Sequence, residues 1–501
     1  MSYLLGIDIG TTNVKAVLFD KKGVEIGVAD QAYPTSHPHP GWAHQQPEDW
    51  YQGVVGAVKR LLDRTGILPE EIMCAGFSGH IRTISFLDEK FEVVYPGIVW
   101  SDTRSAEIAQ KLNEEMEDFL LKVTGNRAAT NYSLPQILWM RENHPEIFKK
   151  TKYFCTPKDY VLWKLTGNFV SDPSNQAGAL LLDIDSKQFS LPLLERMGLK
   201  IDSLPQLKRS VDIAGYVTSQ ASLETGLKEG LPIIVGGGDN DCAAIGAGAY
   251  TPGVVSVSLG TAGIVLTLLE CPDRRVAQSL DMFPHVIPEG WYTMGMVKAA
   301  GFAMGWLKDR LAGEGYEVFS QGEAPSVGEW IQATERGMGE LSPGSDGLFC
   351  FPYYQGRGNP CKDPQAKGVF WGITSSHTNR HLMQASMEGV GYCIKECIQA
   401  IEEFTSVEEI VCCGGGSSSK LWMQILADIL EKPVWTGGGA EKGALGAAIL
   451  ASVGTGLYSS VQQACKVMTR HDSRYLPRRK NCQVYKELFQ QFCALSDLFW
   501  K

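Results

Sequence analysis

The 501-residue chain has ordinary proportions of hydrophobic (44%) and charged (20%) residues and a formal net charge of −10. A chain of this length is too long for one hydrophobic core, so it predicts two domains, residues 1–250 and 251–501. The acidic balance excludes nucleic acid as an expected partner, because no basic excess is present to neutralise a phosphate backbone.

The first twenty residues predict a β-hairpin that holds phosphate. An apolar strand over residues 4–9 runs into the turn Gly10-Thr11-Thr12, and a second strand follows over residues 14–19. The glycine lets the backbone approach an anion, the threonines offer hydroxyl and amide groups, and Lys15 adds a positive charge. Asp8 is a candidate Mg²⁺ ligand, since this ion prefers one or two carboxylates together with water and phosphate oxygens. An ordinary tight hairpin is the competing explanation.

Further along, the pattern indicates the alternating helices and strands of a mixed α/β fold. Helices are expected over residues 49–65, 105–121 and 135–143, and strands over residues 72–79, 84–88 and 232–238.

Three glycines follow the apolar run that ends at Val235, and they permit a sharp turn that presents Asp239 at the carboxyl end of a strand. Asn240 beside it can donate and accept hydrogen bonds to a polyol. For an arbitrary aspartate in this setting, capping of the following helix is the competing explanation, and Asp241 is the better cap candidate.

The phosphate-hairpin pattern returns halfway along the chain. Apolar strands over residues 254–258 and 264–269 flank a turn that contains Gly260 and Thr261. Two such hairpins predict a duplicated domain whose halves face each other across a cleft and hold a polyphosphate. A third feature of this kind is the glycine loop, Gly414 to Ser419, between a strand over 409–413 and a helix expected over 421–430, because a helix N-terminus favours anions.

Together these segments resemble the FGGY family of carbohydrate kinases, within the actin, Hsp70 and hexokinase superfamily, over nearly the whole chain. The order and spacing of further motifs carry the resemblance: Pro40-Gly41-Trp42, Pro96 to Arg104, Gly236 to Asn240, Asp363-Pro364, Gly368 to Ile373 and Gly443 to Ala448. The fold class implied is α/β, with two ribonuclease H-like domains flanking a catalytic cleft. A homodimer is implied as one option for the assembly.

The resemblance implies ATP-dependent phosphorylation of a sugar or polyol hydroxyl, with ATP and Mg²⁺ bound in the cleft. Asp239 matches the carboxylate that acts as general base on the acceptor hydroxyl. The positions expected to contact the nucleotide, from the hairpins, the glycine loop and the resemblance, are Gly10, Thr11, Thr12, Lys15, Gly260, Thr261, Gly301, Gly415, Gly416 and Ser419.

The positions expected to contact the acceptor are His80, Ile81, Arg82, Trp100, Asp102, Asp239 and Asn240. Trp100 and Asp102 match the family's sugar-side loop, although a core position is the competing explanation of the tryptophan. The segment His80-Ile81-Arg82 departs from the family, because xylulokinases have Gln-Met-His there and glycerol kinases have Arg-Glu at its last two positions.

In overall pattern the chain is most similar to xylulokinases, so a ketopentose such as D-xylulose is the first expected acceptor. An aldonate such as gluconate is the second, because the guanidinium of Arg82 favours planar, bidentate partners. A surface salt bridge is the competing explanation of Arg82.

The alternative from another class is a nucleotide switch of the actin or Hsp70 type, which hydrolyses ATP while it binds a protein. The switch explains both hairpins but not the sugar-side loop.

Apolar runs such as residues 444–453 are shorter than the roughly 20 residues that span a membrane. The opening residues enter a strand directly, and the thirteen cysteines show no repeated spacing. We therefore expect free thiols, no membrane association and a cytoplasmic location.

Overall fold

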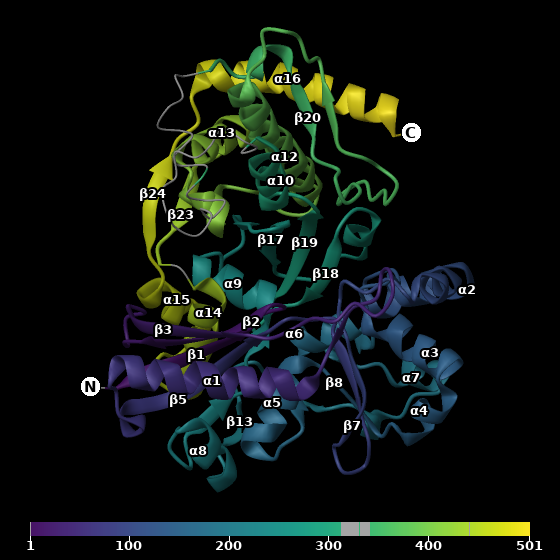
Figure 1. Ribbon diagram of the computed structural model, residues 1–501, viewed down its shortest axis with the longest axis vertical. Coiled ribbons are helices and arrows are strands. Elements are labelled where there is room, and N and C mark those ends of the chain that lie inside the picture. The colour runs from purple at the N-terminus through teal and green to yellow at the C-terminus, as the bar shows by residue number, and fades with distance from the viewer. Residues whose placement is uncertain (1, 312–329, 331–340, 440, 501) are drawn as a thin grey trace.

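The computed structural model describes residues 2–311, 330, 341–439 and 441–500, which form two bodies, each built on a large mixed sheet (Figure 1). The first sheet contains, in spatial order, β13 (Ile213–Tyr216), β14 (Pro232–Ile234), β5 (Ile72–Gly79), β1 (Tyr3–Ile9), β2 (Asn13–Phe19) and β3 (Glu25–Ala32), and β15 (Gly237–Gly238) pairs with the end of β5. β1 is antiparallel to β2 and parallel to β5.

The second sheet repeats this arrangement. Its order is β18 (Asp281–Pro284), β19 (Trp291–Val297), β17 (Gly263–Leu269), β16 (Val254–Leu259), β22 (Glu409–Cys413), β23 (Val434–Gly437) and β24 (His471–Tyr475). β16 is antiparallel to β17 and parallel to β22, as β1 is to β2 and β5. The two predicted phosphate hairpins, β1–β2 and β16–β17, therefore occupy equivalent places in two copies of one sheet.

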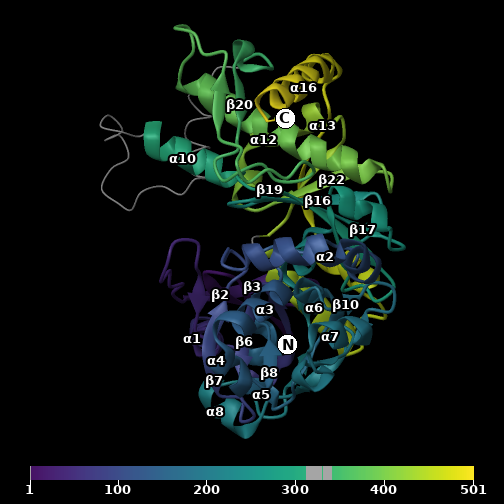
Figure 2. The same ribbon diagram turned by 90° about the vertical axis from the view of Figure 1, so that its right-hand side faces the viewer.

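Helices cover the outer faces of both sheets. On the first body, α1 (Pro47–Thr65) lies over β2 and β3, and α5 (Pro157–Thr166) packs beside it. On the second body, α12 (Asn379–Glu402), α13 (Lys420–Leu430) and α16 (Arg479–Phe499) stack on the side of the sheet away from the first body, and α10 (Gly301–Leu311) packs on α12 (Figure 2).

A smaller subdomain extends the first body. Its sheet has the order β4 (His44–Gln45), β7 (Val93–Ile98), β6 (Ile84–Leu87) and β8 (Tyr153–Cys155), with α2 (Ala106–Thr124), α3 (Ser133–Asn143), α4 (Pro145–Lys150) and α7 (Leu191–Met197) around it. The other short elements are β9 (Val170–Ser171), α6 (Pro173–Gln176), β10 (Leu182–Asp183), β11 (Gln188–Phe189), β12 (Gln206–Leu207), α8 (Ser219–Thr225), β20 (Phe349–Phe351), β21 (Val369–Trp371) and α15 (Val461–Met468).

Two helices, α9 (Asp239–Ala247) and α14 (Lys442–Gly454), lie between the sheets and cross at glycines (Figure 1). A Cβ added at Gly246 would lie 2.1 Å from the carbonyl oxygen of Lys442, and one at Gly446 would lie 2.0 Å from that of Cys242. Lys442 lies four residues before Gly446, and Cys242 lies four residues before Gly246. The two contacts are therefore reciprocal, which indicates a local two-fold axis between the helices. The duplication predicted from the hairpins extends to these helices.

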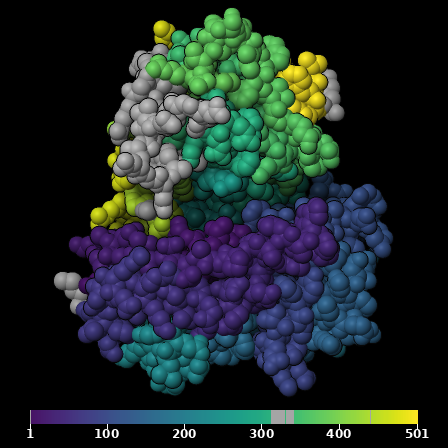
Figure 3. Space-filling model, in the orientation of Figure 1, coloured from purple at the N-terminus to yellow at the C-terminus, as the bar shows by residue number. Residues whose placement is uncertain are grey.

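α14 also approaches the first sheet closely, because Gly6 and Gly76 leave no Cβ between β1 or β5 and its backbone. α14 and α15 follow residue 250 in the chain, yet they pack on the first sheet with Leu4, Val17 and Ile234. The division at residue 250 stays a prediction. In the space-filling view the two bodies meet along a boundary that crosses the whole visible face (Figure 3).

Most of the predicted elements match the structure to within a few residues, and the strands over 72–79 and 409–413 match in full. The strand expected over residues 232–238 is broken into β14 and β15, because Gly236 has a φ of +75°. The helix that follows begins at Asp239, with Gly238 as its N-cap, so neither Asp239 nor Asp241 is its N-cap.

The helix crossing predicts that Gly446→Ala destabilises the protein. The added methyl group collides with the backbone of α9, and overpacking of this kind costs roughly 1–3 kcal/mol. Thermal unfolding should show a lower Tm than that of the unmutated protein.

The matched control is Gly56→Ala in α1, where the added Cβ meets only the flexible ends of Gln31 and Arg60. This variant should keep or slightly raise the Tm, because alanine has the higher helix propensity. An unchanged Tm for Gly446→Ala would contradict the close crossing.

Candidate active site

Three parallel strands end side by side at one edge of the first sheet and bring two carboxylates together. Asp8 on β1 is in register with Ser78 on β5, which is in register with Gly237 on β15. Ser78 Oγ donates a hydrogen bond to Asp8 Oδ1 at 2.7 Å. Asp239 comes directly after β15, so both predicted acidic residues lie at the carboxyl edge of this sheet, where α/β proteins place their ligands.

Asp239 is poised to accept a proton near neutral pH. Burial, together with the negative charge of Asp8, raises its pKa from 3.8 to about 7, although the amide groups of Asn240 and Ile81 donate to its carboxylate and oppose the shift. Burial also raises the pKa of Asp8, against the hydrogen bond from Ser78 and the charge of Lys15. A neighbouring carboxylate disfavours the ionised form of a general base and so raises its pKa toward neutral pH.

The predicted acceptor segment, His80 to Arg82, lies against Asp239 through the Ile81 amide. His80 is buried, its Nδ1 is 2.9 Å from Thr83 Oγ1, and burial lowers its pKa to about 3, so the ring is neutral. Within the described ranges, neither His80 Nε2 nor Arg82 Nε has a hydrogen-bond partner, although both atoms are buried. Buried polar atoms without partners are costly, and at a functional site they point to an absent ligand.

Arg82 is fixed by partners from both bodies. Its φ of +69° is rare for a residue with a side chain and is a form of backbone strain found at functional sites. Its Nη2 atom is 3.0 Å from Asp281 Oδ2, and the guanidinium lies 4.4 Å from the centre of the Tyr132 ring. The competing explanation is a surface salt bridge. Arg82 does form a salt bridge, but its side chain is only 5% exposed, so the pair does not lie on the surface.

In the sugar-side loop, Trp100 and Asp102 differ in exposure. Trp100 is 36% exposed, and its indole nitrogen donates to Thr11 Oγ1 at 3.0 Å, so it is not a core residue. Asp102 is buried, accepts from the Ala43 amide at 2.6 Å and forms an ion pair with Arg104 at 2.6 Å. The structure therefore gives Asp102 a role in holding the loop, and contact with the acceptor stays a prediction for both residues.

Asn240 and the first hairpin turn also lie at this edge. Asn240 donates to Asp239 Oδ1 from its amide and its side chain. The Gly10 carbonyl accepts a hydrogen bond from the Tyr33 hydroxyl, which anchors the turn that carries Thr11 and Thr12. Lys15 forms an ion pair with Glu441 at 2.8 Å, so its charge is already partnered in this structure.

The predicted nucleotide positions of the second body form one cluster. The Gly301 amide, at the start of α10, donates to the Gly260 carbonyl at 2.8 Å, and the amide of Phe302 donates to the Thr261 carbonyl. A Cβ at Gly414 would lie 2.9 Å from the Leu259 carbonyl, so the glycine loop lies against the same turn. Three segments separated by long stretches of sequence thus meet around Gly260.

The three residues of the glycine loop that are expected to contact the nucleotide, Gly415, Gly416 and Ser419, differ in how closely other protein atoms surround them. Residues Gly415–Ser418 form a turn of 3-10 helix. A Cβ at Gly415 would meet nothing within 4 Å, whereas one at Gly416 would meet Leu259 and Trp422. Ser419 is fully buried and caps α13 by accepting from the Trp422 amide, so its local role is structural.

Sequence reasoning missed two contacts that tie β18 and the residue after it to the site. One is the Arg82–Asp281 ion pair, and the other joins His285 Nε2 to Asp241 Oδ1 at 2.9 Å, with both side chains fully buried. Asp241 also accepts from the Val286 amide, so the expectation that it caps a helix is wrong. The one available signal was the alternation of Asp281, Phe283 and His285, which places all three on one face of an extended segment.

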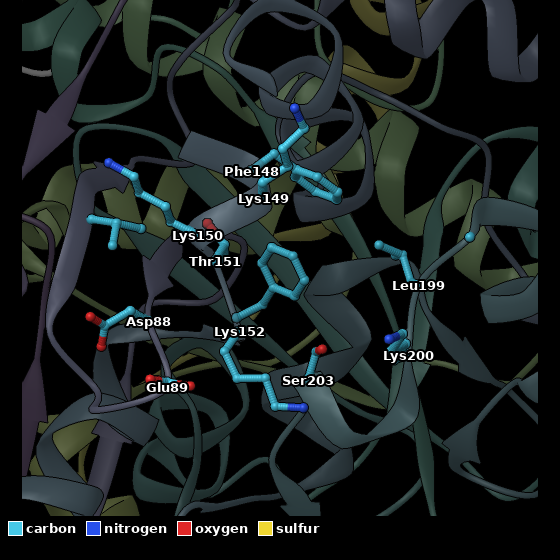
Figure 4. A pocket seen from close by; sticks show the side chains of 13 residues that line it. Asp88, Glu89, Phe148, Lys149, Lys150, Thr151, Lys152, Leu199, Lys200 and Ser203 are labelled. Carbon is cyan, nitrogen blue, oxygen red and sulfur yellow. The ribbon is translucent and has the colours of Figure 1, made fainter. Parts of the chain in front are cut away.

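A hollow of about 600 Å³ lies elsewhere, between α4 and the ends of β6 and β8 (Figure 4). Its lining includes Lys149, Lys150, Lys152 and Lys200, whose ammonium groups point in different directions, and none of the predicted site residues. We assign it no role.

Over the described parts of the chain, no cluster of three or more histidine, cysteine or acidic side chains has the geometry of a metal site, and no helix is long and apolar enough to cross a membrane.

The two duplicated bodies, with paired carboxylates at the edge of one sheet and a glycine cluster on the other, define a sugar kinase of the actin and hexokinase fold. Family models for the FGGY carbohydrate kinases match residues 3–246 (N-terminal domain) and 255–455 (C-terminal domain), so the chain belongs to this family. The expectations of a kinase fold and phosphotransferase activity are confirmed, and the nucleotide-switch alternative is not supported.

Named relatives of the chain include enzymes for different acceptors. A xylulose kinase of Bacillus subtilis is 33% identical over 98% of this chain and 96% of its own length. A gluconokinase of the same organism is 28% identical over 99% and 96%. The crystal structure of a xylulose kinase from Rhodospirillum rubrum superposes with a TM-score of 0.86 at 28% identity, covering 99% and 98% of the two chains.

The raised pKa of Asp239 predicts that Asp239→Asn stabilises the protein above neutral pH. Because the folded state disfavours the ionised carboxylate, the unmutated protein loses stability relative to the variant as pH rises from about 4 through about 7. Thermal unfolding between about pH 5 and about pH 8 should show the gap in Tm opening with pH.

The control for loss of a carboxylate in general is Asp202→Asn at an exposed position, whose Tm should follow that of the unmutated protein. A gap for Asp239→Asn that closes as pH rises would contradict the assignment.

Proposed function

We propose that this carbohydrate kinase transfers the terminal phosphoryl group of ATP to a hydroxyl of a ketopentose, with D-xylulose as the first candidate. The observation that carries the proposal is Asp239, a partly buried carboxylate whose pKa is raised to about 7 and which lies against the segment His80 to Arg82. His80 Nε2 and Arg82 Nε, which have no hydrogen-bond partner among the described residues, suit the hydroxyl groups of a sugar. The xylulose kinases among its relatives support the same acceptor.

Asp239 acts in this proposal as the general base. It orients the acceptor hydroxyl and accepts its proton as the new oxygen–phosphorus bond forms, while the bond between the terminal phosphorus and its bridging oxygen breaks and ADP leaves. Phosphoryl transfer has a loose transition state, so the remaining contribution is positioning and neutralisation of charge. The neutral ring of His80 can donate or accept a hydrogen bond without adding charge beside the base.

Asp8 is the residue proposed to hold Mg²⁺. A partly buried carboxylate fixed by Ser78 beside a phosphate hairpin fits the preference of this ion for few carboxylates and several water or phosphate oxygens. When bound, the ion would neutralise charge on the transferring phosphate. The hydroxyl and amide groups of Thr11 and Thr12 in the first turn would donate hydrogen bonds to the same phosphate.

ATP is proposed to lie against Gly260, Gly301 and Gly415 on the second body. Gly301→Ala should lower both the Tm and the affinity for ATP, because its Cβ would lie 2.5 Å from the Gly260 carbonyl and displace the turn. Gly415→Ala should leave the Tm unchanged, since its methyl group meets no protein atom, and should still weaken ATP binding.

We expect each substitution to raise the Kd for ATP roughly tenfold or more, as misplacement of a phosphate site does. Isothermal titration calorimetry and thermal unfolding separate the two effects. Unchanged ATP affinity in Gly415→Ala would place the nucleotide elsewhere.

The role of Asp239 is tested with Asp239→Ala in a coupled assay of ADP production. The variant should lose roughly 10²- to 10⁴-fold in kcat, the usual contribution of a placed base. Its KM for ATP should change little, because the nucleotide is proposed to bind the other body. Asp241→Asn, which alters the neighbouring buried aspartate, tests whether any change in α9 has this effect. Turnover near that of the unmutated protein in Asp239→Ala would remove the assignment.

A further inference from the structure

The edge of the second sheet presents three side chains to the acceptor side of the first body. Asp281 and Phe283 of β18, with His285 after it, alternate along an extended segment, and all three contact the first body. Asp281 pairs with Arg82, Phe283 lies 5.1 Å from the same guanidinium, and His285 pairs with Asp241. The edge strand is held there by Asn126, whose side chain bonds both the amide and the carbonyl of Met282.

Asp281 lies between two cations and is ionised. Its Oδ2 atom accepts from Arg82 at 3.0 Å and its Oδ1 atom from Lys362 at 2.9 Å. Burial alone would raise its pKa, but the charges of Lys362 and Arg82 lower it to about 2. Asp281 therefore carries a full negative charge at the place where Arg82 carries its positive one.

This pairing changes what Arg82 can recognise. A free guanidinium attracts carboxylates, whereas one whose charge is matched by a largely shielded aspartate offers only hydrogen bonds. Its Nη2 atom is committed to Asp281 and Tyr132, and Nε remains without a described partner. The carboxylates that act on Arg82 are Asp281 and Asp239, and the half-exposed Lys362 is the second cation on Asp281, so an incoming anion would meet no net positive charge among these groups.

We propose that Asp281 is a specificity-determining positioning residue, which cancels the charge of Arg82 and so selects neutral sugars over aldonates. It acts through Arg82 and does not itself touch the acceptor. The inference rests on the proposed function, in that it concerns the acceptor of the same site. It also assigns a purpose to the arginine that stands where xylulokinases have histidine.

The test compares D-xylulose with D-xylonate, a matched pair with the same number of carbon atoms, of which only the second is charged. The unmutated protein should have the higher kcat/KM for xylulose. Asp281→Asn should shift the ratio toward xylonate by roughly tenfold or more, the size expected for removing one charge near a bound anion in a partly buried site. The shift should appear mainly in the KM for xylonate.

A second variant should shift the preference between xylulose and xylonate in the opposite direction. Lys362→Gln removes the cation on the far side of Asp281 and should shift the ratio toward xylulose, by roughly two- to fivefold because the lysine is half exposed. Lys149→Gln, which breaks an exposed pair with Glu146 on α4, should leave the ratio unchanged. In an Arg82→Gln background, Asp281→Asn should lose its effect, as a double-mutant cycle requires of residues that act together.

The outcomes separate the two proposals. If the unmutated protein phosphorylates neither sugar nor aldonate, the proposed function fails, and thermal-shift titration with the same two compounds still measures the preference. If it phosphorylates xylulose while Asp281→Asn and Lys362→Gln leave the ratio unchanged, the proposed function stands and the role of Asp281 is overturned. A native preference for xylonate also overturns it. Should Asp281→Asn fail to fold, the Lys362→Gln result decides alone.

Discussion

The site depends on the contact between α9 and α14, where two glycines let the helix backbones touch. α9 begins with Asp239, and the start of α14 covers Asp8, since a Cβ at Gly443 would lie 2.7 Å from the Asp8 carboxyl carbon. One crossing therefore fixes the base proposed for the reaction and the carboxylate proposed to hold Mg²⁺. It also joins the two sheets, so the same contact that builds the fold sets the geometry of the chemistry.

The second constraint is electrostatic. The protein places two carboxylates, Asp8 and Asp239, in one site, where desolvation raises both pKa values and the charge of Asp8 raises the pKa of Asp239 further. That arrangement costs stability and yields a base suited to neutral pH. The strained backbone of Arg82 belongs to the same region, and its ion pair with Asp281 spans the two bodies. Destabilising features thus gather where the reaction is proposed to occur and are held in place by the surrounding packing.

Much of the fold could be predicted from the sequence because its signals are local. The apolar strands that flank Gly10 and Gly260 and the strand before Gly414 needed only hydrophobic runs and glycine punctuation, and the family resemblance supplied the arrangement. The contacts of Arg82 and Asp241 could not be predicted in this way, because their partners are distant in the sequence. Arg82 pairs with Asp281 of β18, 199 residues away, and Asp241 with a residue just after that strand. Ser419 as a helix cap and Asp102 as a loop anchor likewise depend on neighbours that no local pattern names.

The central claim is that the two hairpin turns and Asp239 serve one reaction. The most direct measurement is a crystal structure of the protein with a non-hydrolysable ATP analogue, Mg²⁺ and D-xylulose. The account predicts a terminal phosphate between the turns at Gly10 and Gly260, with the Asp239 carboxylate in hydrogen-bond contact with an acceptor hydroxyl. A nucleotide bound away from either turn, or an Asp239 that contacts only protein groups, would contradict it.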